Sequence, residues 1–390
     1  MAEPLLDETI RALAPLERAP GSPGEQQAAD WLAERFRSYG CDVSVDHEKI
    51  HGHFWRPVGL HGLLAAAAGW LGLRGRRRAA IALGALAGAG LYDEITGRTY
   101  LTRKVLGRRK TTPNVIAITG DRNAEKTVVV FAHHDAAQSG VIFHPGPQRW
   151  IGEHFPSVIE KNDTAAPLWL PVLLAPWYVV LGALFRRRGL LRWGAFSGAL
   201  TTAFMADIGR HDVVPGANDN LSGVSVLVAL AKRLQDKPVA GVRVMLLSAG
   251  AEETLQEGIR GFAERHFPSL PRERTSFINV DTLGCPTLVM LEGEGAVWME
   301  DYDEEFKDLA EQLAARDGIP LRRGMRARTS TDGVIPMRAG YPTVTLVSMN
   351  AWKALDNYHW PTDVPDNVDL TTVEHALDLT EALVRELPSR

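Results

Sequence analysis

Cysteine is nearly absent from this sequence of 390 residues, which contains only Cys41 and Cys285. Two thiols are too few for a disulfide scaffold or a thiolate zinc site, so any metal must be held by histidine and carboxylate side chains. No charge of one sign dominates, since the net charge is -4 and the pI is about 6.3. This balance argues against a nucleic-acid partner. With 45% hydrophobic and 23% charged residues, the composition also excludes a disordered, collagen-like or coiled-coil protein.

The N-terminal residues lack a basic segment leading into an apolar run, so we expect no cleavable secretory signal. At about 150 residues per domain, the length allows two or three domains, or one α/β unit with insertions. Two apolar segments, 57–92 and 164–206, interrupt a chain that otherwise has the composition of a soluble protein, and each has an arginine-rich turn in its middle. We predict that both are apolar helical hairpins with basic tips, inserted in one domain made of residues 1–56, 93–163 and 207–390.

The two hairpins predict membrane association. Residues 164–185 are uncharged over a length sufficient to cross about 30 Å of hydrocarbon, 57–73 is borderline, and the arms 79–92 and 193–206 are shorter. Several tryptophans in these segments are typical of a membrane interface. Three arrangements stay open: the hairpins span the membrane, they lie in its interface, or they form a helical unit that makes a homodimer with a second copy. We expect a membrane-associated protein, without assigning a face, and a soluble cytoplasmic protein is the alternative.

Outside the hairpins the pattern is that of an α/β protein. Ser22 and Glu25 form a capping box that predicts a helix over 23–39. Strands are expected at 114–119, 127–132, 242–248, 276–281 and 343–348, and further helices at 221–235, 254–266, 303–316 and 371–387. Because runs such as 128–132 are apolar without alternation, we predict a mostly parallel mixed sheet sandwiched by helices.

Side chains of the type that bind metals follow these strands, at the edge where such a sheet binds ligands. The candidate ligands are His133, Asp219, Glu253, Asp281 and His359. This set suits a pair of divalent cations that share one carboxylate. Glu252 is free to act as general base, and Asp135 could accept a hydrogen bond from His133 and fix its tautomer. His134 could replace His133, because a pleated strand points only one of the two inward.

These motifs, in this order, resemble those of the co-catalytic di-zinc aminopeptidases, a family related to glutamate carboxypeptidases and glutaminyl cyclases. The resemblance rests on His133-x-Asp135, Gly216-Ala217-Asn218-Asp219-Asn220-x-x-Gly223, Glu252-Glu253, Asn279-Val280-Asp281 and Tyr358-His359-x-x-x-Asp363. It implies a zinc exopeptidase fold and a peptide substrate. It also implies two Zn²⁺ per chain, one held by His133 and Asp281, the other by Glu253 and His359, with Asp219 bridging both.

By the same resemblance, Glu252 is the general base and Tyr358 steadies the oxyanion. The sequence departs from the family in one respect, because Asp135 and Asp219 are 84 positions apart where the family keeps these motifs close. The second hairpin fills this gap. An insertion is tolerable if it leaves and re-enters at adjacent points, and we therefore expect this hairpin at the mouth of the site.

The sequence thus predicts a zinc-dependent exopeptidase, and within that class an aminopeptidase whose Glu252 and Asp281 recognise the free amino group. A carboxypeptidase would need arginines to clamp a terminal carboxylate. The candidates for that clamp are Arg322, Arg323, Arg326 and Arg328. A glutaminyl cyclase-like acyltransferase with a single zinc and a non-catalytic membrane interaction module are the further alternatives.

Overall fold

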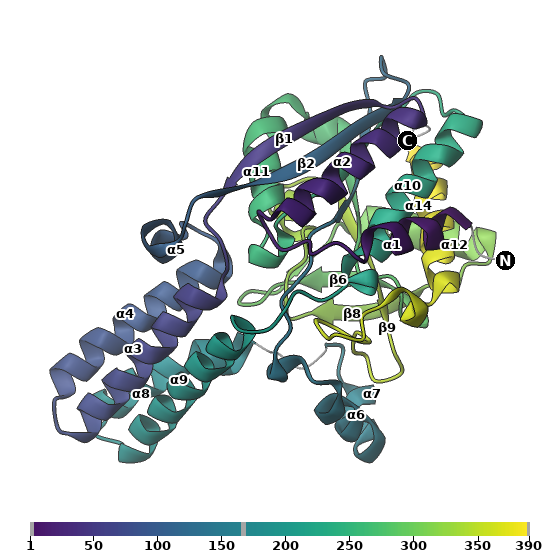
Figure 1. Ribbon diagram of the computed structural model, residues 1–390. Helices are drawn as coiled ribbons and strands as arrows, with labels where there is room; N and C mark the ends of the chain where they lie inside the picture. Colours follow the sequence, from purple (N-terminus) through teal and green to yellow (C-terminus); the bar gives the residue numbers. More distant parts are fainter. Residues whose placement is uncertain (1–3, 165–168, 388–390) are drawn as a thin grey trace.

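The computed structural model describes residues 4–164 and 169–387, arranged as a helix-covered sheet with a separate bundle of helices projecting from it (Figure 1). Residues 165–168 belong to the predicted second hairpin and lie outside the described residues. The same holds for residues 1–3 and 388–390 at the ends of the predicted exopeptidase domain.

Within the described residues, nine strands form one sheet in the order β1-β2-β4-β3-β5-β9-β6-β7, with β8 paired to β6. Their bounds are β1 Asp42–Ile50, β2 Lys110–Gly120, β3 Thr127–His133, β4 Arg243–Ala249, β5 Thr275–Val280, β6 Thr287–Glu294, β7 Glu300–Asp301, β8 Arg322–Ala327 and β9 Thr343–Met349. All five predicted strands are present, and β1, β6, β7 and β8 are additional.

The expectation of a mostly parallel sheet is wrong for its outer part. The central strands β4, β3, β5 and β9 are parallel, whereas β1, β2 and β6 join the sheet through antiparallel pairs. β3 is buried along its whole length, while most of β1 is at least partly exposed. A half-solvated edge suits antiparallel pairing, and a strand covered on both faces suits parallel pairing.

The helices of the body cover both faces of this sheet. They are α1 Pro4–Leu13, α2 Pro23–Ser38, α10 Ser222–Asp236, α11 Glu257–His266, α12 Glu304–Asp317, α13 Val334–Arg338 and α14 Leu370–Glu386. Helices α1, α2, α10, α12 and α14 pack in one apolar core with alternate residues of the strands. Helix α11 packs against the opposite face, where Phe262 lies in a cluster with Phe131 and Phe277. The result is an α/β sandwich, and the start of α2 is capped as predicted, with Glu25 N donating to Ser22 Oγ.

Four further helices form the projecting bundle, which we call the four-helix unit. They are α3 Trp55–Leu73, α4 Arg77–Thr96, α8 Trp169–Leu184 and α9 Arg188–Ile208. Helix α3 packs against α4 and α9, and α8 packs against the same two. Shorter helices α5 Leu101–Leu106, α6 Pro145–His154 and α7 Pro156–Lys161 connect the unit to the body.

Small residues bring the helices of the four-helix unit into close contact. A Cβ atom on Gly69 would stand 2.7 Å from the Cβ of Ala195, so only glycine fits there. Among the described residues, no helix combines the length and apolar character needed to cross a membrane, and the expectation of a spanning segment in 164–185 is not confirmed.

Both excursions of the chain into the four-helix unit begin and end at neighbouring points of the body. The first connects β1 to β2, which are antiparallel partners. The second leaves after Gln138, which forms an isolated bridge with Val213, and Ser139 N donates to Asp212 O at 3.1 Å. The strands that carry the candidate site are therefore not displaced by the helices that intervene in the sequence.

Candidate active site

One carboxylate, that of Asp219, lies between the two candidate histidine ligands. Its Oδ1 is 3.2 Å from His133 Nε2, at the end of β3, and its Oδ2 is 3.2 Å from His359 Nε2. The same nitrogen of His359 is 3.2 Å from Glu253 Oε1. Four of the five predicted metal ligands thus form one chain of contacts, although they come from separate segments of the sequence.

Asp281, the fifth predicted ligand, follows β5 and joins the cluster through Thr282. The hydroxyl of Thr282 lies 2.8 Å from Asp281 Oδ1 and 3.4 Å from Asp219 Oδ1. Burial raises the pKa of Asp281 to about 6, with Asp219 adding to the rise and His133 opposing it. The structure therefore brings all five predicted ligands into one buried region at the carboxyl ends of the strands.

Asp135 holds the backbone of the two glutamates in place. Its carboxylate accepts hydrogen bonds from Glu252 N and Glu253 N, both at 3.0 Å. Its Oδ1 is also 3.3 Å from His133 Nδ1, an ion-pair distance without hydrogen-bond geometry. Asp363 has a similar role on the opposite side, because it accepts from Asn218 N and Asp219 N.

His134 points away from the cluster, as alternation in β3 requires of one of the two histidines. Its Nδ1 lies 2.9 Å from Ser248 Oγ on β4. Burial lowers its pKa to about 4, which keeps the ring neutral at physiological pH. His133 is therefore the histidine that faces the cluster.

The cluster has an excess of negative charge that stabilises any positive charge placed within it. Burial alone would lower the pKa of His359, yet Glu253 and Asp219 raise it to about 10. His133 behaves in the same way, because Asp135 and Asp219 raise its pKa well above the ordinary value against the effect of burial. Carboxylates that stabilise a proton on imidazole this strongly would also stabilise a divalent cation bound in place of that proton.

Two cavities meet at Glu252 and Tyr358. The first, of about 90 Å³, is largely apolar and has Glu253 and His359 at its polar end. The second, of about 120 Å³, contains His133, Asp219 and Asp281 in its wall. Apolar side chains of the first cavity come in part from the four-helix unit and its connections: Phe54, Ile142, Phe143, Trp169, Val172, Met205 and Ile208. Helices α8 and α9 therefore contribute apolar side chains to the wall of the first cavity.

Asp332 was not predicted from the sequence. It is 1% exposed, and among the described residues neither of its carboxylate oxygens has a hydrogen-bond partner. Burial raises its pKa well above the ordinary value, and the nearby carboxylates Asp135, Asp281 and Glu294 add to this against His133. Gln256 was not predicted either, and its Nε2 donates a hydrogen bond to Glu252 Oε1 at 3.1 Å. An Asp-Gly turn at this edge of the sheet was the available signal for Asp332.

The donor set and the unsatisfied atoms fit a metal ion. Ligand atoms of His133, Asp219 and Glu253 lie within 4.8 Å of one another. Glu253 Oε1 and His133 Nδ1 are buried without a hydrogen-bond partner. Imidazole nitrogen and carboxylate oxygen are the ligands of zinc in catalytic sites. A mixed α/β sheet whose strand ends assemble such a site is the arrangement of a metal-dependent exopeptidase.

The comparison with known families agrees with this class. Residues 201–384 match the family model of peptidase family M28. No curated protein sequence matches the chain. The family match and the solved structures below confirm the resemblance to the zinc aminopeptidases and their relatives.

Solved structures with the same fold include aminopeptidases and glutaminyl cyclases. LapB from Legionella pneumophila has a TM-score of 0.57 at 14% identity, over 99% of this chain and 72% of LapB. The aminopeptidase from Aneurinibacillus sp. strain AM-1 has a TM-score of 0.56 at 16% identity, over 98% and 93%. The glutaminyl cyclase from Bacteroides thetaiotaomicron, bound to N-acetylhistamine, has a TM-score of 0.57 at 14% identity, over 97% and 96%. At these identities the likeness concerns the fold.

Proposed function

We propose that this protein is a zinc-dependent exopeptidase, and specifically an aminopeptidase that removes N-terminal residues from peptides. The observation that carries the proposal is the Asp219 carboxylate, which lies 3.2 Å from both His133 and His359. The match to peptidase family M28 and the aminopeptidases of the same fold support it.

The residues of the cluster would hold two zinc ions. His133 and Asp281 would bind one ion, and Glu253 and His359 would bind the other. Asp219 would bind both ions. When bound, zinc polarises a substrate carbonyl and lowers the pKa of water. Asp135 would orient His133 from behind, and its two bonds to the backbone at 252 and 253 would fix the glutamates.

Glu252 would move the proton during hydrolysis. Its side chain borders both cavities, and the hydrogen bond from Gln256 orients Oε1. Burial raises the pKa of Glu252 well above its ordinary value, with His133 opposing and Glu253 adding to the rise. A carboxylate of raised pKa can take a proton from the attacking water and return it to the leaving amine. Tyr358 lies at the junction of the cavities, and its hydroxyl would donate a hydrogen bond to the oxyanion.

The apolar cavity supports an aminopeptidase with a preference for branched aliphatic N-terminal residues. A cavity of about 90 Å³ is smaller than the roughly 150 Å³ that accommodates benzene in a protein interior. It is therefore suited to a side chain such as leucine or valine. Glu252 and Asp281 remain the candidates for the free amino group of the substrate.

The arginines proposed for a carboxypeptidase are mostly engaged elsewhere. Arg323 pairs with four carboxylates, and Arg326 pairs with Asp301 and Asp163. Arg322 is not in the wall of either cavity, whereas Arg328 and the ion-paired Arg326 both border the second one. A carboxypeptidase would therefore depend mainly on Arg328. A single-zinc glutaminyl cyclase would be distinguished by metal analysis, since the aminopeptidase requires two ions per chain.

The test is hydrolysis of a panel of aminoacyl amides by the purified protein, with and without chelator. We expect Glu252→Gln to abolish hydrolysis while the zinc content stays unchanged. Glu305→Gln makes the same chemical change at an exposed position and serves as the matched control. Near-normal turnover by Glu252→Gln would refute the assignment of the base, and failure to hydrolyse any amide with zinc present would refute the exopeptidase.

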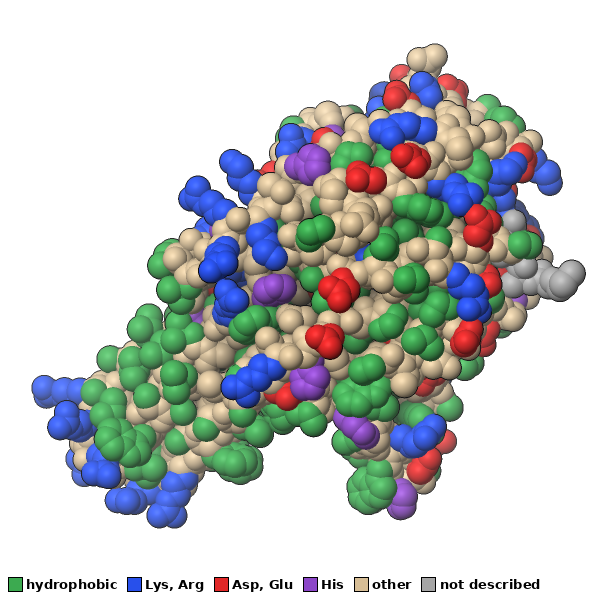
Figure 2. All heavy atoms as spheres, in the orientation of Figure 1, with side chains coloured by type: hydrophobic (Ala, Val, Ile, Leu, Met, Phe, Trp, Pro, Cys, Tyr) green, Lys and Arg blue, Asp and Glu red, His purple; other side chains and the backbone are tan. Residues whose placement is uncertain are grey.

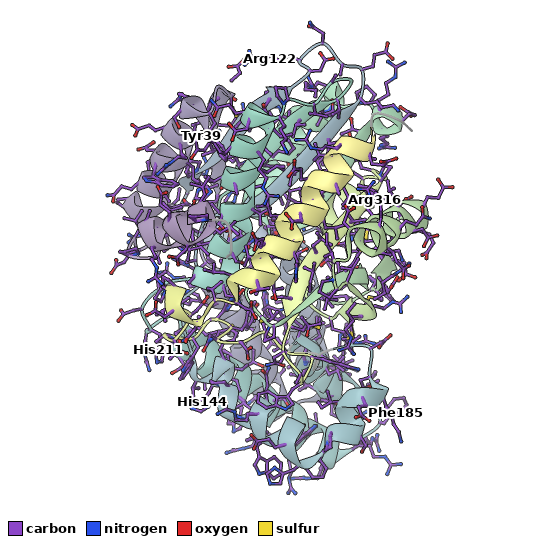
Figure 3. All side chains as sticks on the ribbon, turned by 90° about the vertical axis from the view of Figure 1, so that its right-hand side faces the viewer. Tyr39, Arg122, His144, Phe185, His211 and Arg316 are labelled. Atoms are coloured by element: carbon purple, nitrogen blue, oxygen red, sulfur yellow. The ribbon has the colours of Figure 1, made fainter. Side chains whose placement is uncertain are left out.

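The four-helix unit supports a second proposal, association with a membrane surface through 57–92 and 164–206. Its interior contains small residues such as Ala65 and Ala80, while Trp70, Trp177 and Phe185 are about half exposed or more. Figure 2 shows hydrophobic side chains over the visible face of the unit and Lys or Arg at its free end. In Figure 3, Phe185 lies at the opposite end of the molecule from Arg122. Large apolar side chains outside and small ones inside are expected of helices in contact with lipid.

Sedimentation with lipid vesicles would test this surface. We expect the protein to bind vesicles, and substitution of Trp177 and Phe185 by serine to release it. A homodimer that buries the same side chains is the alternative, and sedimentation velocity without lipid would detect it. The division into an exopeptidase domain and two inserted hairpins stays a prediction, as does membrane association, for which no face is assigned.

A further inference from the structure

A cavity of about 470 Å³ lies at the base of the four-helix unit, where β1 leads into α3 and α5 leads into β2. Positively charged or titratable side chains form much of its wall: His51, His53, Arg56, Arg103, Arg108 and Lys110. None of its lining residues, all within the described chain, is an aspartate or glutamate. The cavity therefore has a strongly positive interior.

Three of these cations have no carboxylate partner within the described ranges. Arg103 is paired with Glu94 and Glu257, which neutralise its charge. By contrast, Arg56 and Arg108 form no ion pair, and Lys110 Nζ contacts only the carbonyl oxygen of Pro20, at 3.3 Å. Like charges around one cavity repel each other, and an anion between them would relieve this repulsion.

The effect of this charge is visible at His53, within the same cavity. Burial lowers its pKa to about 4, and the positive charges of Lys110, Arg56 and Arg103 contribute. The ring is therefore neutral at physiological pH and can accept or donate a hydrogen bond. One edge of the cavity is apolar, because Pro57, Leu60 and Leu106 also line it, and the side chain of Leu106 is 57% exposed.

We propose that this cavity is a binding site for a phosphate group. The three positive charges of two arginines and a lysine are more than a ligand with a single carboxylate would neutralise. Guanidinium groups match the oxygens of phosphate in geometry and charge. The apolar edge formed by Leu60 and Leu106 suits a phosphate ester that carries an apolar substituent. Such a group comes either from a lipid headgroup or from a free phosphorylated compound, and both share the chemistry recognised here. The cavity shares no lining residue with the two cavities at the catalytic cluster, and the proposal does not depend on the exopeptidase.

The experiment compares Arg56→Gln and Arg108→Gln with the wild-type full chain. Both arginines are exposed, so the substitutions leave the fold intact, which thermal unfolding would verify. Arg109→Gln is the matched control, because Arg109 is exposed and adjacent in sequence but does not line the cavity. Binding of inorganic phosphate is measured by calorimetry. Binding to vesicles of phosphatidylcholine, with and without phosphatidylglycerol, is measured by sedimentation.

We expect each cavity variant to raise the Kd for inorganic phosphate about tenfold or more, as loss of a charge-assisted hydrogen bond predicts, while the control leaves it unchanged. If the cavity variants also reduce binding to phosphatidylglycerol vesicles more than the control does, the phosphate belongs to a lipid. If only inorganic phosphate is affected, the source is a soluble phosphate. The proposal is overturned if wild type binds neither probe, or if the cavity variants and Arg109→Gln have equal effects on both.

Discussion

Replacing Asp135 by asparagine tests whether this carboxylate organises the metal cluster. Asp135 is fully buried and accepts hydrogen bonds from Glu252 N and Glu253 N while lying 3.3 Å from His133 Nδ1. Asparagine has nearly the same shape but only one accepting oxygen, so at least one of the two backbone N–H groups loses its partner. A hydrogen bond to a charged group contributes about 1.5–3 kcal/mol, and loss of a partner that orients a ligand weakens metal binding about 10- to 100-fold.

Two measurements separate these effects. Zinc affinity is determined by competition with a chelator, and the free energy of unfolding of the metal-free protein by urea titration. We expect Asp135→Asn to lower both, the second by about 2 kcal/mol. Asp303→Asn is the control, since Asp303 caps α12 through Phe306 N and asparagine caps a helix equally well. Unchanged zinc affinity and unchanged stability in Asp135→Asn would refute the reasoning.

Two further predictions concern stability. Burial alone would raise the pKa of Glu292, but Arg323 and Lys307 lower it to about 2. The resulting stabilisation is complete above the unfolded-state pKa of about 4.3 and is lost as the pH falls toward 2. Glu292→Gln should therefore lower the free energy of unfolding by about 1 kcal/mol at pH 6, after allowance for solvent screening, and by less at pH 3; an equal difference at both pH values would contradict this. Gly69→Ala should lower the unfolding temperature, because its Cβ would stand 2.7 Å from Ala195 Cβ, whereas Gly189→Ala, with open space around it, should not. Thermal unfolding of both variants would decide, and equal shifts would argue against close packing in the four-helix unit.

The predicted strands followed from local patterns, which left both His133 and His134 possible as the inward-facing histidine. Positions 128–132 are all apolar, which identified a strand buried on both faces and placed His133 at its end. Strands β1 and β8 were missed because their exposed edges carry charged residues such as Lys49 and Arg322, whose pattern is weak in the sequence. Strand β1 is antiparallel to β2, whereas β8 is parallel to β6, so only β1 accounts for part of the antiparallel pairing that the prediction of a mostly parallel sheet missed.

The cluster itself could be expected only in part. Motif order and the family resemblance gave the type of each ligand and the bridging place of Asp219, but its contacts with His133 and His359 join residues 86 and 140 positions apart, which no local pattern encodes. Asp332 shows more clearly what could not be predicted from the sequence. A single aspartate in a turn carries no periodic signal, and its burial results from packing of the β8–α13 connection against the site.

The bridge between Gln138 and Val213 has a consequence for how this protein can change. The chain leaves the body and returns to it at neighbouring residues. The segment between them, which we call the cassette, can therefore be exchanged or redesigned without moving His133 before it or Asp219 after it. Because Val172 and Met205 belong to that cassette and also border the catalytic cavity, a new cassette would alter which peptides enter while the hydrolytic machinery stays as it is.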